Sequence, residues 1–315
     1  MNASAPSTLY SIVVPVYNTA QSLVELSDRV HAVFEQLPAA DYELIFIDDA
    51  SPSPETWRVL TQLAQSNSHI RIIQLMRNFG QQAATLCGMA RARGDYIITM
   101  DDDLQHYPED IPKLIAQQHH DIVIIEFRKK YHSAFKRITS KLKGWFDHIL
   151  IGKPKHIQLS SFRLIRRSVI DAMLTIHTPN PFIPALMFYV SKDIVGVPAE
   201  HGKRKEGKTG YTFGKLVRVF SNLIINNSAF LLKSIGYIGI TISLFSFLLA
   251  LYILIKKVVW GVAIAGWSSL MVTILFIGGL LLFAIGVIGE YLLRIISGVE
   301  HKPTYVIRQQ QGLEA

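Results

Sequence analysis

The chain has 315 residues, a formal net charge of +8 and a hydrophobic fraction of 50%. This length fits one large domain, or one domain with an appended segment. The single cysteine, Cys87, excludes an intramolecular disulfide and a cysteine-based metal site, and its helical surroundings predict a buried core residue.

Short apolar runs alternate with helical patterns through the first half of the chain. Runs rich in β-branched residues predict buried strands at 10–16, 42–48, 70–75, 96–100 and 121–127. Segments with helical periodicity lie between them, at 20–36, 54–67 and 81–93. This alternation predicts right-handed βαβ units in an open, mostly parallel α/β sheet, which binds ligands at the carboxyl ends of its strands.

Basic residues gather after the fifth predicted strand. Segment 128–143 interleaves them with aromatic residues and has no acidic residue, and segment 201–211 is also basic. Such a surface suits lipid headgroups or an anionic lipid substrate, and the alternative is a solvated helix face. The residues expected to bind a lipid phosphate are Arg128, Lys136, Arg137, Lys141, Arg204 and Lys208.

The last third of the chain contains two uncharged apolar runs, within 234–255 and 267–289. Each has the roughly 20 residues needed to cross a bilayer, so two transmembrane helices are predicted; a buried hairpin is the alternative. Residues 214–233 are amphipathic and predict a helix along the membrane interface. No signal peptide is evident, and basic residues flanking the two runs outnumber those in their connecting loop.

These patterns predict a multi-pass protein of the inner (plasma) membrane with four parts. Residues 1–213 form a cytoplasmic α/β domain, 214–233 the interfacial helix, 234–289 the two transmembrane helices, and 290–315 a cytoplasmic tail.

Three consecutive aspartates follow the fourth predicted strand. In extended backbone, Asp101 and Asp103 face the same way while Asp102 points elsewhere. Two carboxylates aimed at one point suit a hard divalent cation, Mg²⁺ or Mn²⁺, and Gln105 adds an amide oxygen. The alternative is a polar loop that caps a helix near Pro108.

The motifs IVVPVYN (residues 12–18), IFIDDAS (45–51) and RNFGQQAATLCGMARARGDYIITMDDDLQHYPEDIP (77–112), with the two apolar runs, carry a resemblance to a known family. They resemble the bacterial polyprenyl-phosphate glycosyltransferases of glycosyltransferase family 2, which are related to dolichol-phosphate mannose synthase. The resemblance implies a GT-A fold and transfer of a sugar from a nucleoside diphosphate sugar, expected to be a UDP-hexose, to undecaprenyl phosphate. The product would serve glycan or lipid modification of the cell envelope, and a homo-oligomer is expected.

The resemblance also implies roles for individual residues. Asp49 would contact the base, and Asp102 would lie beside the sugar and ribose. Asp101, Asp103 and Gln105 match the motif for the metal and the diphosphate, and Arg163 joins Asp101 and Asp103 as a catalytic residue. The residues expected to bind the nucleotide sugar are Pro15, Tyr17, Asn18, Asp48, Asp49 and Asp102.

The implied chemistry needs no strong base, because a lipid phosphate is already an anionic nucleophile. A divalent ion stabilises the departing nucleoside diphosphate as a Lewis acid. Single displacement at the anomeric carbon inverts its configuration.

The chain departs from the family pattern at four positions. Thr19 stands where the family often has Glu, Gln158 and Ser161 replace two acids, and Gly210 lies in a segment where relatives have a different motif. These changes predict a different donor sugar or acceptor contact, with the reaction retained.

Three other functions are alternatives to sugar transfer onto a lipid phosphate. A processive polysaccharide synthase usually has a Q-x-x-R-W motif and more membrane spans, neither of which is found here. A catalytically inactive membrane scaffold has no need for the mutual repulsion of three aspartates. Nucleic-acid binding is not expected, because lipid phosphates account for the positive charge.

Overall fold

The computed structural model describes residues 8–127, 157–178, 181–199, 266–299 and 302–312, with positions 154, 241, 248, 252, 255 and 259. The chain divides into two compact units: Met1–Gly210 with His301–Ala315, and Tyr211–Glu300. The C-terminal end therefore belongs to the same unit as the N-terminal two thirds.

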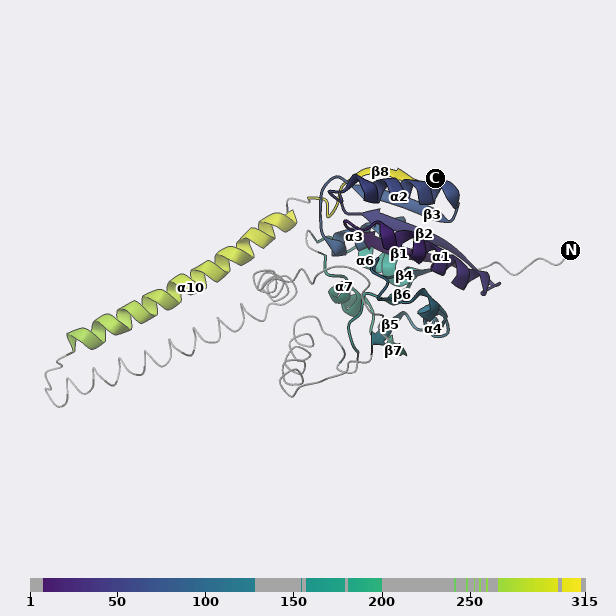
Figure 1. Cartoon of the computed structure of the whole chain (residues 1–315). Coiled ribbons are helices and arrows are strands. Elements are labelled where there is room, and N and C mark those ends of the chain that lie inside the picture. Colours follow the sequence, from purple (N-terminus) through teal and green to yellow (C-terminus); the bar gives the residue numbers. More distant parts are fainter. Residues whose placement is uncertain are drawn as a thin grey trace, which may run out of the picture. The chain divides into compact units, whose positions relative to one another are not determined.

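The first unit is built on a mixed sheet whose described strands run in the order β7-β5-β6-β4-β1-β2-β3-β8 (Figure 1). β1 pairs in parallel with both β2 and β4, and β2 pairs in parallel with β3. This confirms the predicted parallel centre of the sheet. The strands are β1 (Thr8–Val16), β2 (Ala40–Asp48), β3 (Ile70–Leu75), β4 (Tyr96–Thr99), β5 (Ile122–Phe127), β6 (Arg163–Arg166), β7 (Ile194–Ala199) and β8 (Ile307–Gln311).

The sheet departs from the prediction in its outer strands. β6 lies between β4 and β5 and is antiparallel to both, so the fifth predicted strand does not pair with the fourth. β8 closes the opposite edge, antiparallel to β3, where the sequence predicted only a tail (Figure 1). Both strands are short, and the run RQQQ of β8 is wholly polar.

The three predicted helices are confirmed as α1 (Gln21–Glu35), α2 (Pro54–Ser66) and α3 (Gln81–Arg91). Ser53 caps α2 by accepting a hydrogen bond from the Glu55 N–H, with Pro54 at the first position. The other described helices of this unit are η1 (Pro108–Asp110), α4 (Ile111–Ile115), α6 (Arg167–Leu174) and α7 (Ile183–Val190).

Helix α3 packs closely on the centre of the sheet. A Cβ atom at Gly88 would lie 2.5 Å from Val13 Cγ1 and 2.6 Å from Ile47 Cδ1, so this contact leaves no room for a side chain. Cys87 is fully buried, as predicted, and burial raises the pKa of its thiol to about 12. This close packing holds α3 against the sheet, and the first residues of the helix border the site described below.

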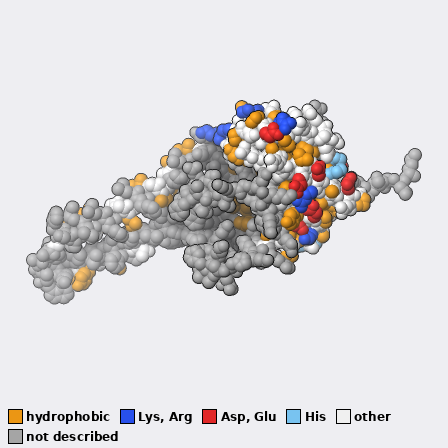
Figure 2. Space-filling view, in the orientation of Figure 1, with side chains coloured by type: hydrophobic (Ala, Val, Ile, Leu, Met, Phe, Trp, Pro, Cys, Tyr) orange, Lys and Arg blue, Asp and Glu red, His pale blue; other side chains and the backbone are white. Residues whose placement is uncertain are grey.

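Acidic and basic side chains lie close together on the face of the first unit shown in Figure 2. One ion pair of this unit joins α1 to η1, the short helix that follows Asp101–Asp103 in the chain. Arg29 of α1 donates to Glu109 of η1 through Nη2 (2.6 Å) and Nε (2.9 Å).

The described part of the second unit is mainly α10 (Trp267–Val299), a helix of 33 residues with exposed apolar side chains such as Leu281, Ile285 and Leu292. Among the residues that the structure describes, no helix has both the length and the apolar character needed to cross a membrane. The predicted interfacial helix and most of the first predicted span lie outside the described residues.

Candidate active site

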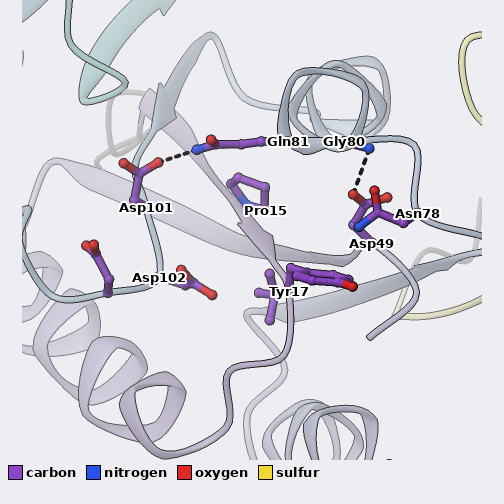
Figure 3. Close-up of a pocket in the computed structure, with 10 residues that line it drawn as sticks. Pro15, Tyr17, Asp49, Asn78, Gly80, Gln81, Asp101 and Asp102 are labelled. Carbon is purple, nitrogen blue, oxygen red and sulfur yellow. Dashed lines mark hydrogen bonds between the residues drawn. The ribbon is translucent and has the colours of Figure 1, made fainter. Parts of the chain in front are cut away.

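A pocket opens at the carboxyl ends of β1, β2 and β4, where a sheet of this kind is expected to bind its ligand (Figure 3). It encloses about 310 Å³, which lies at the lower end of the ~300–1,000 Å³ usual for ligand pockets. Its lining residues are Pro15, Val16, Tyr17, Asp49, Asn78, Gly80, Gln81, Asp101, Asp102 and Asp103.

The loops after β1 and β2 are tied together beside the pocket. Asn18 N–H donates to Ser51 Oγ over 2.8 Å, and Ser51 N–H donates to Asp48 Oδ1 over 2.9 Å. Asn18 and Ala50 both have positive φ angles, 57° and 54°. These bonds hold a backbone that is costly for residues other than glycine, and they place Tyr17 and Asp49 in the pocket wall.

Asp49 organises a third loop, between β3 and α3. Its Oδ1 accepts from Phe79 N–H over 2.7 Å. Its Oδ2 accepts from Gly80 N–H over 2.8 Å (Figure 3). Burial raises the pKa of the Asp49 carboxyl, and these two backbone bonds oppose the rise. Gly80, with φ of 92°, adopts a conformation that suits glycine, so the sequence NFG brings Asn78 and Gly80 into the pocket.

Asp101 is held by side chains from three directions. Gln81 Nε2 donates to its Oδ1 over 2.7 Å (Figure 3). Ser161 Oγ donates to its Oδ2, also over 2.7 Å. Its backbone N–H donates to Nδ1 of His106 over 3.0 Å. The His106 ring is stacked against Phe127 and Phe162, so a buried aromatic cluster fixes the first aspartate of the motif.

Asp102 points into the pocket on the side of Tyr17, away from the Asp101 carboxylate (Figure 3). Burial raises the pKa of the Asp102 carboxyl to about 6, and a hydrogen bond from Thr19 opposes the rise. Among the described residues, Asp102 Oδ2 is a buried oxygen without a hydrogen-bond partner. A buried acceptor in this state suits a ligand that brings a hydroxyl group or a positive charge.

Asp103 shapes the turn that follows. Its Oδ1 accepts from Gln105 N–H over 3.1 Å, and Leu104 between them has a φ of 59°. Asp103 lines the pocket, whereas the Gln105 side chain is not among the lining residues.

The described residues contain no group of three or more His, Cys, Asp or Glu side chains arranged to hold a metal ion. A magnesium-type site, however, usually takes one or two carboxylates together with substrate phosphates. Asp101 and Asp103 both line this pocket, so two carboxylates are available to one cation. These residues therefore fit a divalent cation that arrives with a diphosphate.

Two predicted site residues lie behind the pocket wall. The Asp48 side chain is fully buried, and its carboxylate accepts from Ser51 N–H and from Gln74 Nε2, the latter over 2.9 Å. Arg163 is also buried, and its Nε donates to Thr99 Oγ1 over 3.2 Å. Both support neighbouring residues here and do not line the pocket.

Arg163 is a buried positive charge close to the aspartates. Burial lowers the pKa of its guanidinium to about 10, and the charge of Asp101 opposes that shift. Arg163 thus offsets part of the negative charge of the motif from within the protein.

The six residues predicted to bind a lipid phosphate, Arg128, Lys136, Arg137, Lys141, Arg204 and Lys208, lie outside the described residues. Four further residues of the site, Asn78, Gly80, Gln81 and His106, are not among those predicted from the sequence. The first three fall in the RNFGQQ stretch and His106 directly follows Gln105, so all four belong to the block that carries the family resemblance.

The family model that matches the chain is described as glycosyl transferase family 2 and covers residues 11–174. That range includes every described residue of the pocket.

Two curated relatives, from Photorhabdus laumondii and Erwinia tasmaniensis, are both named undecaprenyl-phosphate 4-deoxy-4-formamido-L-arabinose transferase. The first is 33% identical over 307 residues, covering 96% of this chain and 94% of the relative. The second is 33% identical over 309 residues, covering 97% of this chain and 95% of the relative. The similarity therefore extends well beyond the pocket domain.

A solved structure similar to this chain is glucosyl-3-phosphoglycerate synthase from Mycobacterium tuberculosis, in complex with Mn²⁺, uridine diphosphate and phosphoglyceric acid. It is 16% identical, with a TM-score of 0.51, and the match covers 69% of this chain and 76% of that chain. This likeness concerns the fold alone, and it agrees with the predicted GT-A architecture.

Proposed function

The chain belongs to glycosyltransferase family 2, and on this premise we propose that it transfers a sugar from a nucleoside diphosphate donor to polyprenyl phosphate. The observation that carries the proposal is the pocket itself, which joins Tyr17 and Asp49 to three aspartates at the strand ends. The names of the full-length relatives favour undecaprenyl phosphate as the acceptor.

The donor is proposed to lie across the ends of β1 and β4. Tyr17 and Asp49 would contact the nucleotide, because they line the side of the pocket formed by the loops after β1 and β2. The unpartnered Oδ2 of Asp102 would accept a hydrogen bond from a sugar or ribose hydroxyl. The sugar would then lie close to Asp101 and Asp103.

The residues of the chain bind and orient the reacting groups. The nucleophile and the leaving group both belong to the substrates. An oxygen of the lipid phosphate forms a bond to the anomeric carbon, and the bond from that carbon to the diphosphate oxygen breaks. The bonding electrons leave with the nucleoside diphosphate, and the configuration inverts. A divalent cation, Mg²⁺ or Mn²⁺, held by Asp101 and Asp103 with Gln105 nearby, would supply Lewis-acid stabilisation to that leaving group.

We place the reaction at the cytoplasmic face of the inner membrane, with the apolar runs 234–255 and 267–289 as membrane segments. The pairing of β8 with β3 supports this arrangement, because it puts the two ends of segment 200–301 on the same side of any membrane. The exposed apolar side chains of α10 would contact lipid or a second copy of the chain in a homo-oligomer. The basic segments 128–143 and 201–211 would bind the acceptor phosphate.

The identity of the donor sugar is part of the proposal. The family resemblance favours a UDP-hexose, whereas the curated relatives are named for transfer of a modified pentose. Ser161 and Thr19 both contact the aspartate motif, so they are placed to influence this choice.

The test is a transfer assay with the purified full chain, undecaprenyl phosphate, Mg²⁺ or Mn²⁺, and a panel of labelled nucleotide sugars. The panel includes UDP-hexoses, UDP-N-acetylhexosamines and UDP-linked modified pentoses. Label in the lipid fraction, lost in an Asp101→Asn variant, is the expected result. Label in a polymer would favour the synthase alternative, and no transfer from any donor would favour an inactive scaffold.

A further inference from the structure

The C-terminal strand β8 forms an edge of the sheet, next to β3, whose following loop borders the pocket. It lies along β3 at the sheet edge (Figure 1). Gln309 stands directly opposite Gln74 in the pairing register. Gln309 Nε2 donates to Gln74 Oε1 over 2.8 Å. This pair is the start of a longer chain of hydrogen bonds.

The chain of bonds runs from the tail to the pocket. Gln74 Nε2 donates to Asp48 Oδ2 over 2.9 Å, and the other oxygen of Asp48 accepts from Ser51 N–H. Ser51 Oγ in turn accepts from Asn18 N–H over 2.8 Å. Each step therefore joins a different element: β8 to β3, β3 to β2, and the loop after β2 to the loop after β1.

The direction of these bonds is fixed by Asp48. An ionised carboxylate accepts hydrogen bonds and cannot donate them, so the amide nitrogen of Gln74 must face it. The amide oxygen of Gln74 then faces β8 and needs a donor. The Gln309 amide supplies that donor, and a glutamate of the same shape would not.

The far end of the chain of bonds lies at two strained positions of the pocket wall. Asn18 and Ala50, which adjoin the pocket residues Tyr17 and Asp49, have positive φ angles. Such backbone conformations persist only where surrounding contacts stabilise them. Here the two hydrogen bonds of Ser51, with Asn18 and with Asp48, stabilise them.

The tail also fixes the start of the third pocket loop. Met76 N–H donates to Val306 O over 2.8 Å, and Arg308 Nη2 donates to Met76 O over 3.1 Å. Met76 immediately precedes residues 77–81, which bring Asn78, Gly80 and Gln81 to the pocket. All three loops that border the donor side therefore have contacts that lead back to residues 306–309.

We propose that Gln309 is a positioning residue for the donor pocket, acting through Gln74 and Asp48 on the loops that carry Tyr17 and Asp49. It does not touch the substrate. The proposal rests on the proposed function, because it takes this pocket to be the nucleotide site. It assigns the residues after α10 an indirect part in donor binding, through the loops that line the pocket.

The neighbouring glutamine provides a matched control. Gln310 lies in the same strand and is also exposed, but its partner in the register is Ile73 and its side chain points to the opposite face. Gln309→Glu and Gln310→Glu thus make the same chemical change one residue apart. Gln309→Lys restores a donor toward Gln74 and serves as the rescue variant.

The experiment measures two properties of the purified full chain: hydrogen exchange of the amides of Asn18 and Ser51 without ligand, and the affinity for UDP. For Gln309→Glu we expect faster exchange at both amides. UDP affinity should weaken by about threefold to tenfold, the range that one net hydrogen bond contributes. KM for the donor should rise by a similar factor, with kcat less affected. Gln310→Glu should behave like the unmodified chain, and Gln309→Lys should recover most of the loss.

Unchanged exchange and unchanged UDP affinity in Gln309→Glu would overturn the proposal. Equal effects in Gln309→Glu and Gln310→Glu would also overturn it, because they would reflect a general weakening of the edge strand. If the unmodified chain failed to bind UDP while the exchange results were as expected, the nucleotide assignment would fail and the positioning role would stand.

Discussion

The Ser161 hydroxyl donates a 2.7 Å hydrogen bond to Oδ2 of Asp101. Ser161 stands where the family resemblance leads one to expect an acid. A carboxylate at this distance would repel Asp101, whereas the hydroxyl donates a hydrogen bond to it. With Gln81 on the other oxygen, both carboxylate oxygens of Asp101 receive a side-chain donor.

Replacing this serine should lower turnover without unfolding the protein. Hydrogen bonds to charged groups contribute about 1.5–3 kcal/mol, so Ser161→Ala should reduce kcat by roughly tenfold or more. Ser161→Asp should reduce it further at a given metal concentration, because it adds a like charge. Transfer kinetics for both variants test this, with Ser168→Ala on the exposed face of α6 as the control. Wild-type kcat in Ser161→Ala would mean that Asp101 does not depend on this bond.

Asp103 gives a direct test of the proposed cation site. Asp103→Ala should abolish sugar transfer while the protein stays folded and associated with membranes. Asp103→Asn keeps an oxygen that can accept from Gln105 N–H, so it preserves the turn and removes only the charge. We expect both variants to lose transfer and to lose the enhancement of UDP binding by Mn²⁺. Near-normal turnover in either variant would exclude the metal role.

The sequence predicted the centre of the fold because its elements have strong local patterns. The β-branched runs of β1 to β5 and the periodicity of α1 to α3 identify them without tertiary information. β6 and β8 were not predicted, because neither RLIR nor the polar run of β8 has the apolar or alternating pattern typical of a strand. They become strands through pairing with β4, β5 and β3, which the local sequence does not encode.

The main residues of the site could also be predicted, because their positions follow from the predicted strands. Residues after strand ends are brought to one edge of the sheet by topology, so Tyr17, Asp49 and the three aspartates could be grouped in advance. Which of the grouped residues would be buried behind the pocket wall could not be predicted. Asp48 and Arg163 lie behind the wall because their partners, Gln74 and Thr99, belong to other strands.

Gly88 offers a test of the packing that supports the pocket. Alanine in a helix is ordinarily more favourable than glycine by ~1 kcal/mol, so a free helix would gain stability from Gly88→Ala. Here the new methyl group would lie 2.5 Å from Val13 and 2.6 Å from Ile47, and overpacking of this kind costs ~1–3 kcal/mol. We therefore expect a lower thermal unfolding midpoint and weaker UDP binding. A raised midpoint would show that α3 moves away from the sheet at little cost.

The pair formed by Arg29 and Glu109 should make stability depend on pH. The hydrogen bonds from Arg29 lower the pKa of the Glu109 carboxyl in the folded protein. A lowered folded pKa means that the stabilisation is present above the ordinary glutamate value of about 4.3 and is lost as the pH falls through the folded value. Because the Glu109 side chain is 56% exposed, the contribution should stay below about 1 kcal/mol.

Glu109→Gln should therefore lower the thermal unfolding midpoint at neutral pH by a small amount, and the difference from the unmodified chain should shrink in acid. Thermal unfolding of both proteins at pH 7 and at about pH 3.5 measures this. Glu25→Gln is the matched control, since Glu25 contacts the same arginine at 3.5 Å and should have a smaller effect. A difference for Glu109→Gln that persists unchanged in acid would show that the residue acts through packing between α1 and η1, and that its charge is unimportant.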